Sequence, residues 1–132
     1  MEWLIPCNPA YYDVEGAFAK LKTLNWKQTS PKIEVGDIVF IYVSKPVAAV
    51  RYKCKVNKVN LPARVIDDAE FVLNSETYAE YPRHMELELI RTYTEELNSN
   101  VLANNGVKGR IQCPRRVKAK LLSFISNLEE MK

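Results

Sequence analysis

The residues best suited to ligand binding lie in a tryptophan-containing polar segment and in the two strands expected after it. Trp26 opens the run WKQTS at 26–30, and the run VGDIVFIY at 35–42 follows before a strand-like run at 50–56. An indole ring stacks on a flat nucleic-acid base with a gain of about 1–3 kcal/mol. We therefore expect Trp26 to form one wall of a base pocket. The alternative is a tryptophan that anchors a helix end to the core.

Polar and aromatic side chains near Trp26 are candidates to complete this pocket. Amide and hydroxyl groups satisfy the hydrogen-bonding edge of a base. Tyrosines on adjacent strands supply a second wall or a hydroxyl. The candidates are Asn8, Gln28, Thr29, Ser30, Tyr42 and Tyr52. The alternatives are turn and helix-cap chemistry for the polar residues and interior packing for the tyrosines.

Basic residues form two groups that are suited to phosphate contact. The first group lies along one strand, because alternation along 48–59 predicts a half-exposed strand with one basic face. Pro114 suits the first position of a last helix, which would bring the second group to the positive end of a helix dipole. The candidates are Arg51, Lys53, Lys55 and Lys58 in the strand, and Arg110, Arg115 and Arg116 near the helix. The alternative is a solvated charged surface.

The sequence offers little for catalysis or for metal binding. His84 is the only histidine, and Cys7, Cys54 and Cys113 are widely spaced without a CxxC pair. This spacing disfavours a zinc site and a Cys-His catalytic pair. The acidic stretch 67–70 lacks the glycine of a calcium loop. We therefore expect no catalytic residue, no metal and no cofactor, and we expect reduced, structural thiols.

Composition and charge set the class of protein. The chain has 132 residues, a net charge of +3, 47% hydrophobic residues and 27% charged residues, so we expect one globular domain spanning 1–132. The modest charge permits nucleic-acid binding without requiring it. No apolar run approaches the roughly 18 residues of a membrane span, and a signal-peptide pattern is absent from the N-terminus. We expect no membrane partner and a cytoplasmic location.

The elements that must position these residues follow from hydrophobic periodicity. Residues 38–43 are almost continuously apolar, which predicts a strand buried on both faces. In the next strand, we expect Val50, Tyr52, Cys54 and Val56 to share one face. The remaining expectations are a strand at 3–6, a helix at 11–24, a helical turn at 66–71, a strand at 85–93, a helix at 94–103 and a last helix from 114. This order predicts an α+β fold with a small, curved mixed sheet and helices around it.

The sequence pattern from Trp26 through the 35–42 run, Pro46 and Cys54 resembles the EVE domain of the PUA-like superfamily, which is related to the YTH and ASCH domains. The resemblance covers residues 2–59, and the remainder agrees only in element order. A Gly-Pro-Arg-Arg type segment of some EVE-like chains is also similar to 109–116, although Cys113 stands where glycine is expected. The resemblance implies a PUA-like mixed β pseudobarrel of five or six strands, flanked by helices. It also implies a module that binds modified bases in DNA or RNA, often within restriction and other defence systems.

Residues and resemblance together predict a non-catalytic binding module. A modified base in DNA or RNA would be extruded into the aromatic pocket while basic residues hold the phosphates. A separate effector protein would be a further partner, and residues 61–82 would cover the pocket or close the barrel. Two alternatives stay open: a nucleic-acid-processing hydrolase of ASCH-like type, and a protein-interaction or regulatory subunit.

Overall fold

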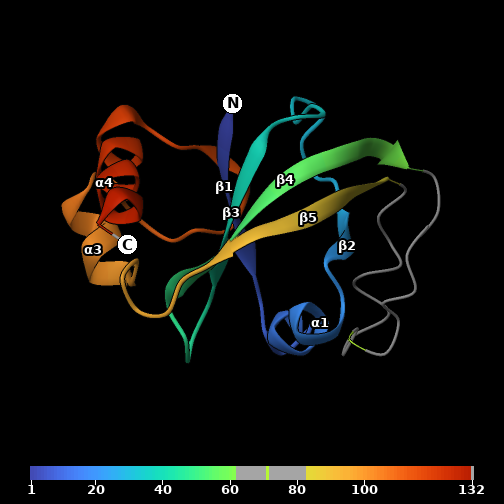
Figure 1. Cartoon of the computed structure of the whole chain (residues 1–132), viewed down its shortest axis with the longest axis horizontal. Coiled ribbons are helices and arrows are strands. Elements are labelled where there is room, and N and C mark those ends of the chain that lie inside the picture. The colour runs from blue at the N-terminus through green and yellow to red at the C-terminus, as the bar shows by residue number, and fades with distance from the viewer. Residues whose placement is uncertain (62–70, 72–82, 132) are drawn as a thin grey trace.

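A single mixed sheet of six described strands organises the chain (Figure 1). The structure, a computed structural model, describes residues 1–61, 71 and 83–131. The strands are β1 (Glu2–Cys7), β2 (Thr23–Lys27), β3 (Ile38–Val43), β4 (Ala49–Leu61), β5 (His84–Thr92) and β6 (Arg115–Arg116), and the helices are α1 (Val14–Lys20), α3 (Ser99–Asn104) and α4 (Ala119–Glu130). The strand order is β2-β5-β4-β3-β1-β6, in which β1 and β3 are parallel and the other pairs are antiparallel.

The sheet separates two hydrophobic cores. We call the cluster that contains Trp3 and Ile5 the inner core, and the cluster that contains Leu4 the outer core. Successive residues of β1 thus alternate between the two. The outer core is covered by α3 and α4, which lie together at one side of the sheet in Figure 1. The inner core joins Ile5 to Trp26, although β1 and β2 are far apart in the strand order. The sheet is therefore strongly curved, as predicted.

The predicted strand at 38–43 is confirmed as β3, and its burial on both faces is confirmed too. Val39 and Ile41 contribute to the inner core, whereas Phe40 contributes to the outer core. The nearly continuous apolar run is explained by this central position, since β3 lies between β4 and β1.

The side chains of β4 lie on the predicted faces of the sheet except at one residue. Tyr52, Cys54 and Val56 belong to the inner core, but Val50 belongs to the outer core. The reason is a register shift: Ile41 pairs with Tyr52 and Tyr42 pairs with Val50, which leaves Arg51 as an extra residue on β4. Such a β-bulge reverses the faces of the residues on its two sides.

The predicted helix at 11–24 is confirmed only at 14–20 and is wrong at both ends. The helix α1 begins after its N-cap Asp13, whose side chain accepts the Gly16 N–H, and ends at Lys20. Leu21 is already extended, with φ −118° and ψ 145°, and Thr23–Lys27 forms β2 against β5. Trp26 therefore lies in a strand and not in a polar loop. Pairing with β5 overrides a helical spacing that extended by coincidence to Leu24.

The two C-terminal helices begin later than predicted. The helix α3 starts after Asn98, whose side chain caps the Val101 N–H, while Thr94 donates from its own backbone to Glu96. The helix α4 starts after Lys118, and Pro114 precedes the short strand β6. The expected placement of two arginines at a helix N-terminus is therefore wrong. The predicted helical turn at 66–71 lies outside the described residues except for Phe71.

No helix in the described part of the chain is long and apolar enough to cross a membrane.

Candidate functional site

A small pocket lies where the curved sheet fails to close by strand pairing. Its volume is about 170 Å³, below the roughly 300–1,000 Å³ of sites for drug-sized ligands. The edge strand β2 forms one wall, and the segment 112–114 that leads into the other edge strand, β6, forms the opposite wall. We call this the seam pocket; its lining residues are Ile5, Pro6, Trp26, Lys27, Thr29, Met85, Gln112, Cys113 and Pro114.

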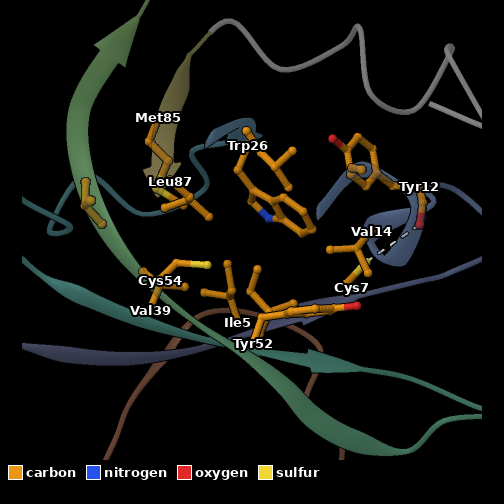
Figure 2. Packing of buried hydrophobic residues seen from close by; sticks show 14 of the residues in the cluster. Ile5, Cys7, Tyr12, Val14, Trp26, Val39, Tyr52, Cys54, Met85 and Leu87 are labelled. Atoms are coloured by element: carbon orange, nitrogen blue, oxygen red, sulfur yellow. Dashed lines mark hydrogen bonds between the residues drawn. The ribbon is translucent and has the colours of Figure 1, made fainter. Parts of the chain in front are cut away.

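Trp26 is a core residue that also lines the seam pocket. Only 5% of the residue is exposed, and its ring packs edge-on against Tyr12 with the ring centroids 5.3 Å apart. Figure 2 shows the indole projecting from β2 into the inner core, with Met85 and Leu87 on one side and Val14 on the other. Since Trp26 also lines the seam pocket, a small part of its surface is presented to that space.

The polar neighbours of Trp26 divide between the pocket and the fold. Thr29 is exposed and lines the seam pocket. Gln28 is buried, and its amide joins two backbone segments: Oε1 accepts the Asn60 N–H at 2.8 Å and Nε2 donates to the Ser30 carbonyl at 3.3 Å. The Ser30 hydroxyl accepts the Lys32 N–H at 3.3 Å. Gln28 and Ser30 therefore order the chain beside the pocket and do not line it.

A larger groove adjoins the seam pocket and is bounded by α3, by the ends of β1 and β3, and by the segment 107–112. Its volume is about 820 Å³. We call it the α3 groove; its lining residues are Asn8, Tyr42, Ser44, Lys45, Ala48, Ser99, Leu102, Ala103, Val107, Gly109, Arg110, Ile111 and Gln112. Three of the predicted site residues meet here, namely Asn8, Tyr42 and Arg110. Gln112 lines both spaces, so the two cavities are neighbours.

Tyr52 lies apart from both cavities. The bulge at Arg51 turns Tyr52 to the inner face of the sheet, whereas Tyr42 packs against the outer core. Tyr52 is buried against Phe18, with the ring centroids 4.9 Å apart, and burial raises the pKa of its hydroxyl. The structure therefore does not bring the two tyrosines together as one pocket wall.

The basic row on β4 is largely engaged within the fold. Arg51 Nε donates to the Tyr93 carbonyl at 2.9 Å, and Lys53 Nζ lies 3.2 Å from the Glu129 carboxylate on α4. Burial opposes ionisation of Glu129, but hydrogen bonds from Tyr93 and Lys53 lower the pKa of its carboxyl on balance. Lys55 is exposed on the same strand. Lys53 thus helps to dock α4 on the sheet.

Arg115 fixes the backbone of the segment 108–110, which lies beside the cavities. Its Nη1 donates to the Lys108 carbonyl at 2.9 Å and its Nη2 donates to the Arg110 carbonyl at 2.7 Å. The next residue, Arg116, is exposed, with its guanidinium carbon 5.4 Å from the centre of the Trp3 ring. Both arginines line a third cavity of about 180 Å³ beside the segment 105–108.

The three cavities share one sign of charge. Among the described residues that line them, seven are basic and none is acidic. We call these seven the basic surface: Lys27, Lys45, Lys108, Arg110, Arg115, Arg116 and Lys118. Four of them were missed in the sequence. A signal was present, since the stretch 108–118 holds five basic residues and no acid.

The thiols differ in accessibility. Cys7 and Cys54 are buried, and burial raises the pKa of the Cys7 thiol to about 12. Cys113 is exposed at the wall of the seam pocket.

His84 is buried on β5. Within the residues that the structure describes, no three His, Cys, Asp or Glu side chains gather to hold a metal ion.

Solved structures share this architecture. No protein-family model matches the sequence, and no curated protein matches it. The chain is similar to ASCH from Zymomonas mobilis (TM-score 0.64, 15% identity, 95% of this chain and 94% of that one) and to the DUF55 domain of human thymocyte nuclear protein 1 (0.63, 15%, all of both chains). A protein from Pseudomonas putida aligns with a TM-score of 0.67 at 18% identity, over 97% of this chain and 99% of that one.

These neighbours define the class of fold. The six-stranded mixed sheet with its helices is the PUA-like α+β fold of ASCH and DUF55 domains, which confirms the predicted fold class. At identities of 15–18% the likeness concerns the fold alone. Membership of the EVE family stays a prediction.

Proposed function

We propose that this chain is a nucleic-acid-binding module that contacts phosphates through the basic surface. The observation that carries the proposal is the seven basic side chains around three neighbouring cavities, with no acidic side chain among the described residues that line them. Lys and Arg side chains that neutralise phosphates release counterions and so drive association. A net charge of only +3 is compatible with this function because seven of the 19 basic residues line these cavities.

We further propose that the seam pocket takes one extruded base and favours a methylated one. The pocket is small, and much of its lining is apolar: Ile5, Pro6, Met85 and Pro114 accompany Trp26. Burying one added methyl group in such surroundings is worth about 0.8 kcal/mol, or about fourfold in affinity. Thr29 and Gln112 supply polar groups for the edge of the base.

Cys113 makes a direct test of pocket occupancy possible. It is the one exposed cysteine of three, so iodoacetamide should alkylate it selectively. We expect oligonucleotides to slow this alkylation several-fold, and methylated ones to do so at lower concentration. The probes are DNA and RNA strands, single and double, that carry cytosine, 5-methylcytosine, 5-hydroxymethylcytosine, adenine or N6-methyladenine. Binding and strand integrity are measured at two salt concentrations, with and without Mg²⁺.

Two controls define the outcomes of this test. A Cys113→Ser variant should lose the rapid alkylation, which assigns the signal to that residue. Oligonucleotide binding with an unchanged alkylation rate would overturn the seam pocket as the base site. Absence of salt-sensitive binding would overturn nucleic-acid recognition and favour the protein-interaction alternative, whereas strand cleavage would favour the hydrolase.

The two neighbouring arginines are expected to contribute differently to binding. Arg116→Ala should reduce the slope of log affinity against log salt by about 0.7–0.9, the value for one lost phosphate contact. Arg115→Lys keeps the charge but cannot bridge the carbonyls of Lys108 and Arg110, because an ammonium lacks the planar fork of guanidinium. We expect about tenfold weaker binding with an unchanged slope.

Arg116→Lys is the matched control for the second variant. It preserves the charge at an exposed position, so the affinity should stay within about twofold of the parent. Equal effects of Arg115→Lys and Arg116→Lys on affinity would show that bracing of the 108–115 segment does not matter for binding. Fluorescence anisotropy across a salt series measures all of these variants.

A further inference from the structure

The α3 groove is a separate and larger space than the seam pocket. A single base bound in the seam pocket would leave the groove empty. Its volume of about 820 Å³ lies within the roughly 300–1,000 Å³ typical of ligand sites, whereas the seam pocket has about 170 Å³. Both spaces are lined by Gln112. The two spaces are therefore adjacent at Gln112, so a ligand that extends beyond the seam pocket on this side would meet the α3 groove.

The lining of the groove contains the partners that a nucleotide requires. Lys45 and the exposed Arg110 supply positive charge for a phosphate. The aromatic ring of Tyr42 offers a surface on which a base can stack. Leu102 and Ile111 add apolar surface. No carboxylate occurs among the described lining residues, so the groove favours an anionic ligand over a cationic one.

Two polar side chains in the groove are held in place by the backbone. Asn8 Oδ1 accepts the Ala10 N–H at 2.9 Å, and Ser44 Oγ donates to the Cys7 carbonyl at 3.3 Å. Both side chains are therefore oriented before any ligand arrives, which lowers the entropy cost of binding. An oriented amide and hydroxyl are the groups that read the edge of a base or contact a sugar.

The segment 107–112, which also lines the α3 groove, is ordered too. Arg115 fixes the backbone at Lys108 and Arg110 through two carbonyls, and Gly109 adopts a left-handed conformation with φ 74° that favours glycine. The Arg110 backbone is therefore anchored while its side chain is exposed at the groove. This arrangement suits a residue that meets a ligand at a defined position.

We propose that the α3 groove binds the nucleotide next to the one whose base occupies the seam pocket. The ligand is then a single strand of at least two nucleotides, with the linking phosphate beside Gln112 and Arg110. This inference rests on the proposed function, since it extends the ligand of the seam pocket by one unit.

The test compares ligands that differ by one nucleotide. Probes are mononucleotides of cytosine, 5-methylcytosine, adenine and N6-methyladenine, and the dinucleotides that join each of them to thymidine on the 5′ or the 3′ side. Dissociation constants are measured by calorimetry, and pocket occupancy is measured by protection of Cys113. We expect one dinucleotide polarity to bind at least tenfold more tightly than its mononucleotide.

Arg110→Ala should remove this gain, measured as the ratio of the mononucleotide and dinucleotide dissociation constants within the variant. The matched control is Lys22→Ala, which removes an exposed lysine that lines none of the three cavities and should alter neither measurement. If mononucleotides protect Cys113 but a second nucleotide adds nothing, or if Arg110→Ala retains the gain, the groove assignment is overturned alone. If the oligonucleotides bind but no dinucleotide does, the groove assignment is again overturned alone. If neither these probes nor the oligonucleotides bind, the proposed function is overturned together with it.

Discussion

Replacing Trp26 with alanine is expected to lower the free energy of unfolding by about 3–5 kcal/mol, the usual cost of deleting a buried aromatic side chain. The indole lies in the inner core with 5% exposure and packs edge-on against Tyr12. Small domains are stable by only about 5–15 kcal/mol, so this loss is large. Urea denaturation followed by circular dichroism measures it without depending on tryptophan fluorescence.

Trp26→Phe separates the structural role of this residue from a role in binding. Phenylalanine keeps an aromatic ring against Tyr12, so we expect a destabilisation of about 1–2 kcal/mol and a folded protein. In that variant, discrimination between methylated and unmethylated oligonucleotides should decrease while the salt dependence stays the same. Stability of Trp26→Ala equal to that of the parent would contradict the buried position and would place the indole at the surface.

The strands were predictable where local pattern and tertiary position agree. The β3 run is apolar throughout because both of its faces are covered. In β4, the alternating residues after the bulge all face the inner core, as their pattern predicts. The boundary between α1 and β2 was not predictable, because the two residues there, Leu21 and Lys22, are neither glycine nor proline and give no signal that a helix ends. The pairing of β2 with β5, whose residues are distant in sequence, decides the conformation there.

Some of the residues that line the cavities were predictable from their type, but their grouping was not. Trp26, Thr29, Asn8, Tyr42 and Arg110 do line cavities, yet they divide between two of them. The division follows from where segment 112–114 runs beside β1, and that course depends on the two-residue strand β6. Local sequence contains no signal for so short a pairing. The bulge at Arg51, which separates the tyrosines, is likewise a property of the paired strands.

The Val-Gly-Asp motif that carries the resemblance to EVE domains proves to contain a structural anchor. Asp37 is buried at the start of β3, where Oδ2 accepts the Trp3 indole N–H and the Glu34 backbone N–H, each at 2.9 Å. Gly36 precedes it with φ 93°, a conformation that favours glycine. The motif therefore ties β1 to β3 and reports on the fold more than on the ligand.

Asp37→Ala is expected to destabilise the protein by about 2–6 kcal/mol, because it leaves two donors without their acceptor at a cost of about 1–3 kcal/mol each. Burial raises the pKa of the Asp37 carboxyl, but hydrogen bonds from the Glu34 N–H, the Trp3 indole and the terminal ammonium lower it below its usual value on balance. A carboxyl with a lowered pKa stabilises the fold fully above its unfolded pKa of about 3.9, and this contribution is lost as the pH falls through the folded value.

The free energy of unfolding should therefore decrease in the parent as the pH falls below about 4, and less steeply in Asp37→Asn, which cannot ionise. Glu129 has a lowered pKa as well and adds to the acid sensitivity, so Glu129→Gln is the matched control and the double variant should show the flattest profile. Urea titrations across this range provide the data. An Asp37→Asn profile parallel to that of the parent would show that the carboxylate charge does not secure β1 to β3.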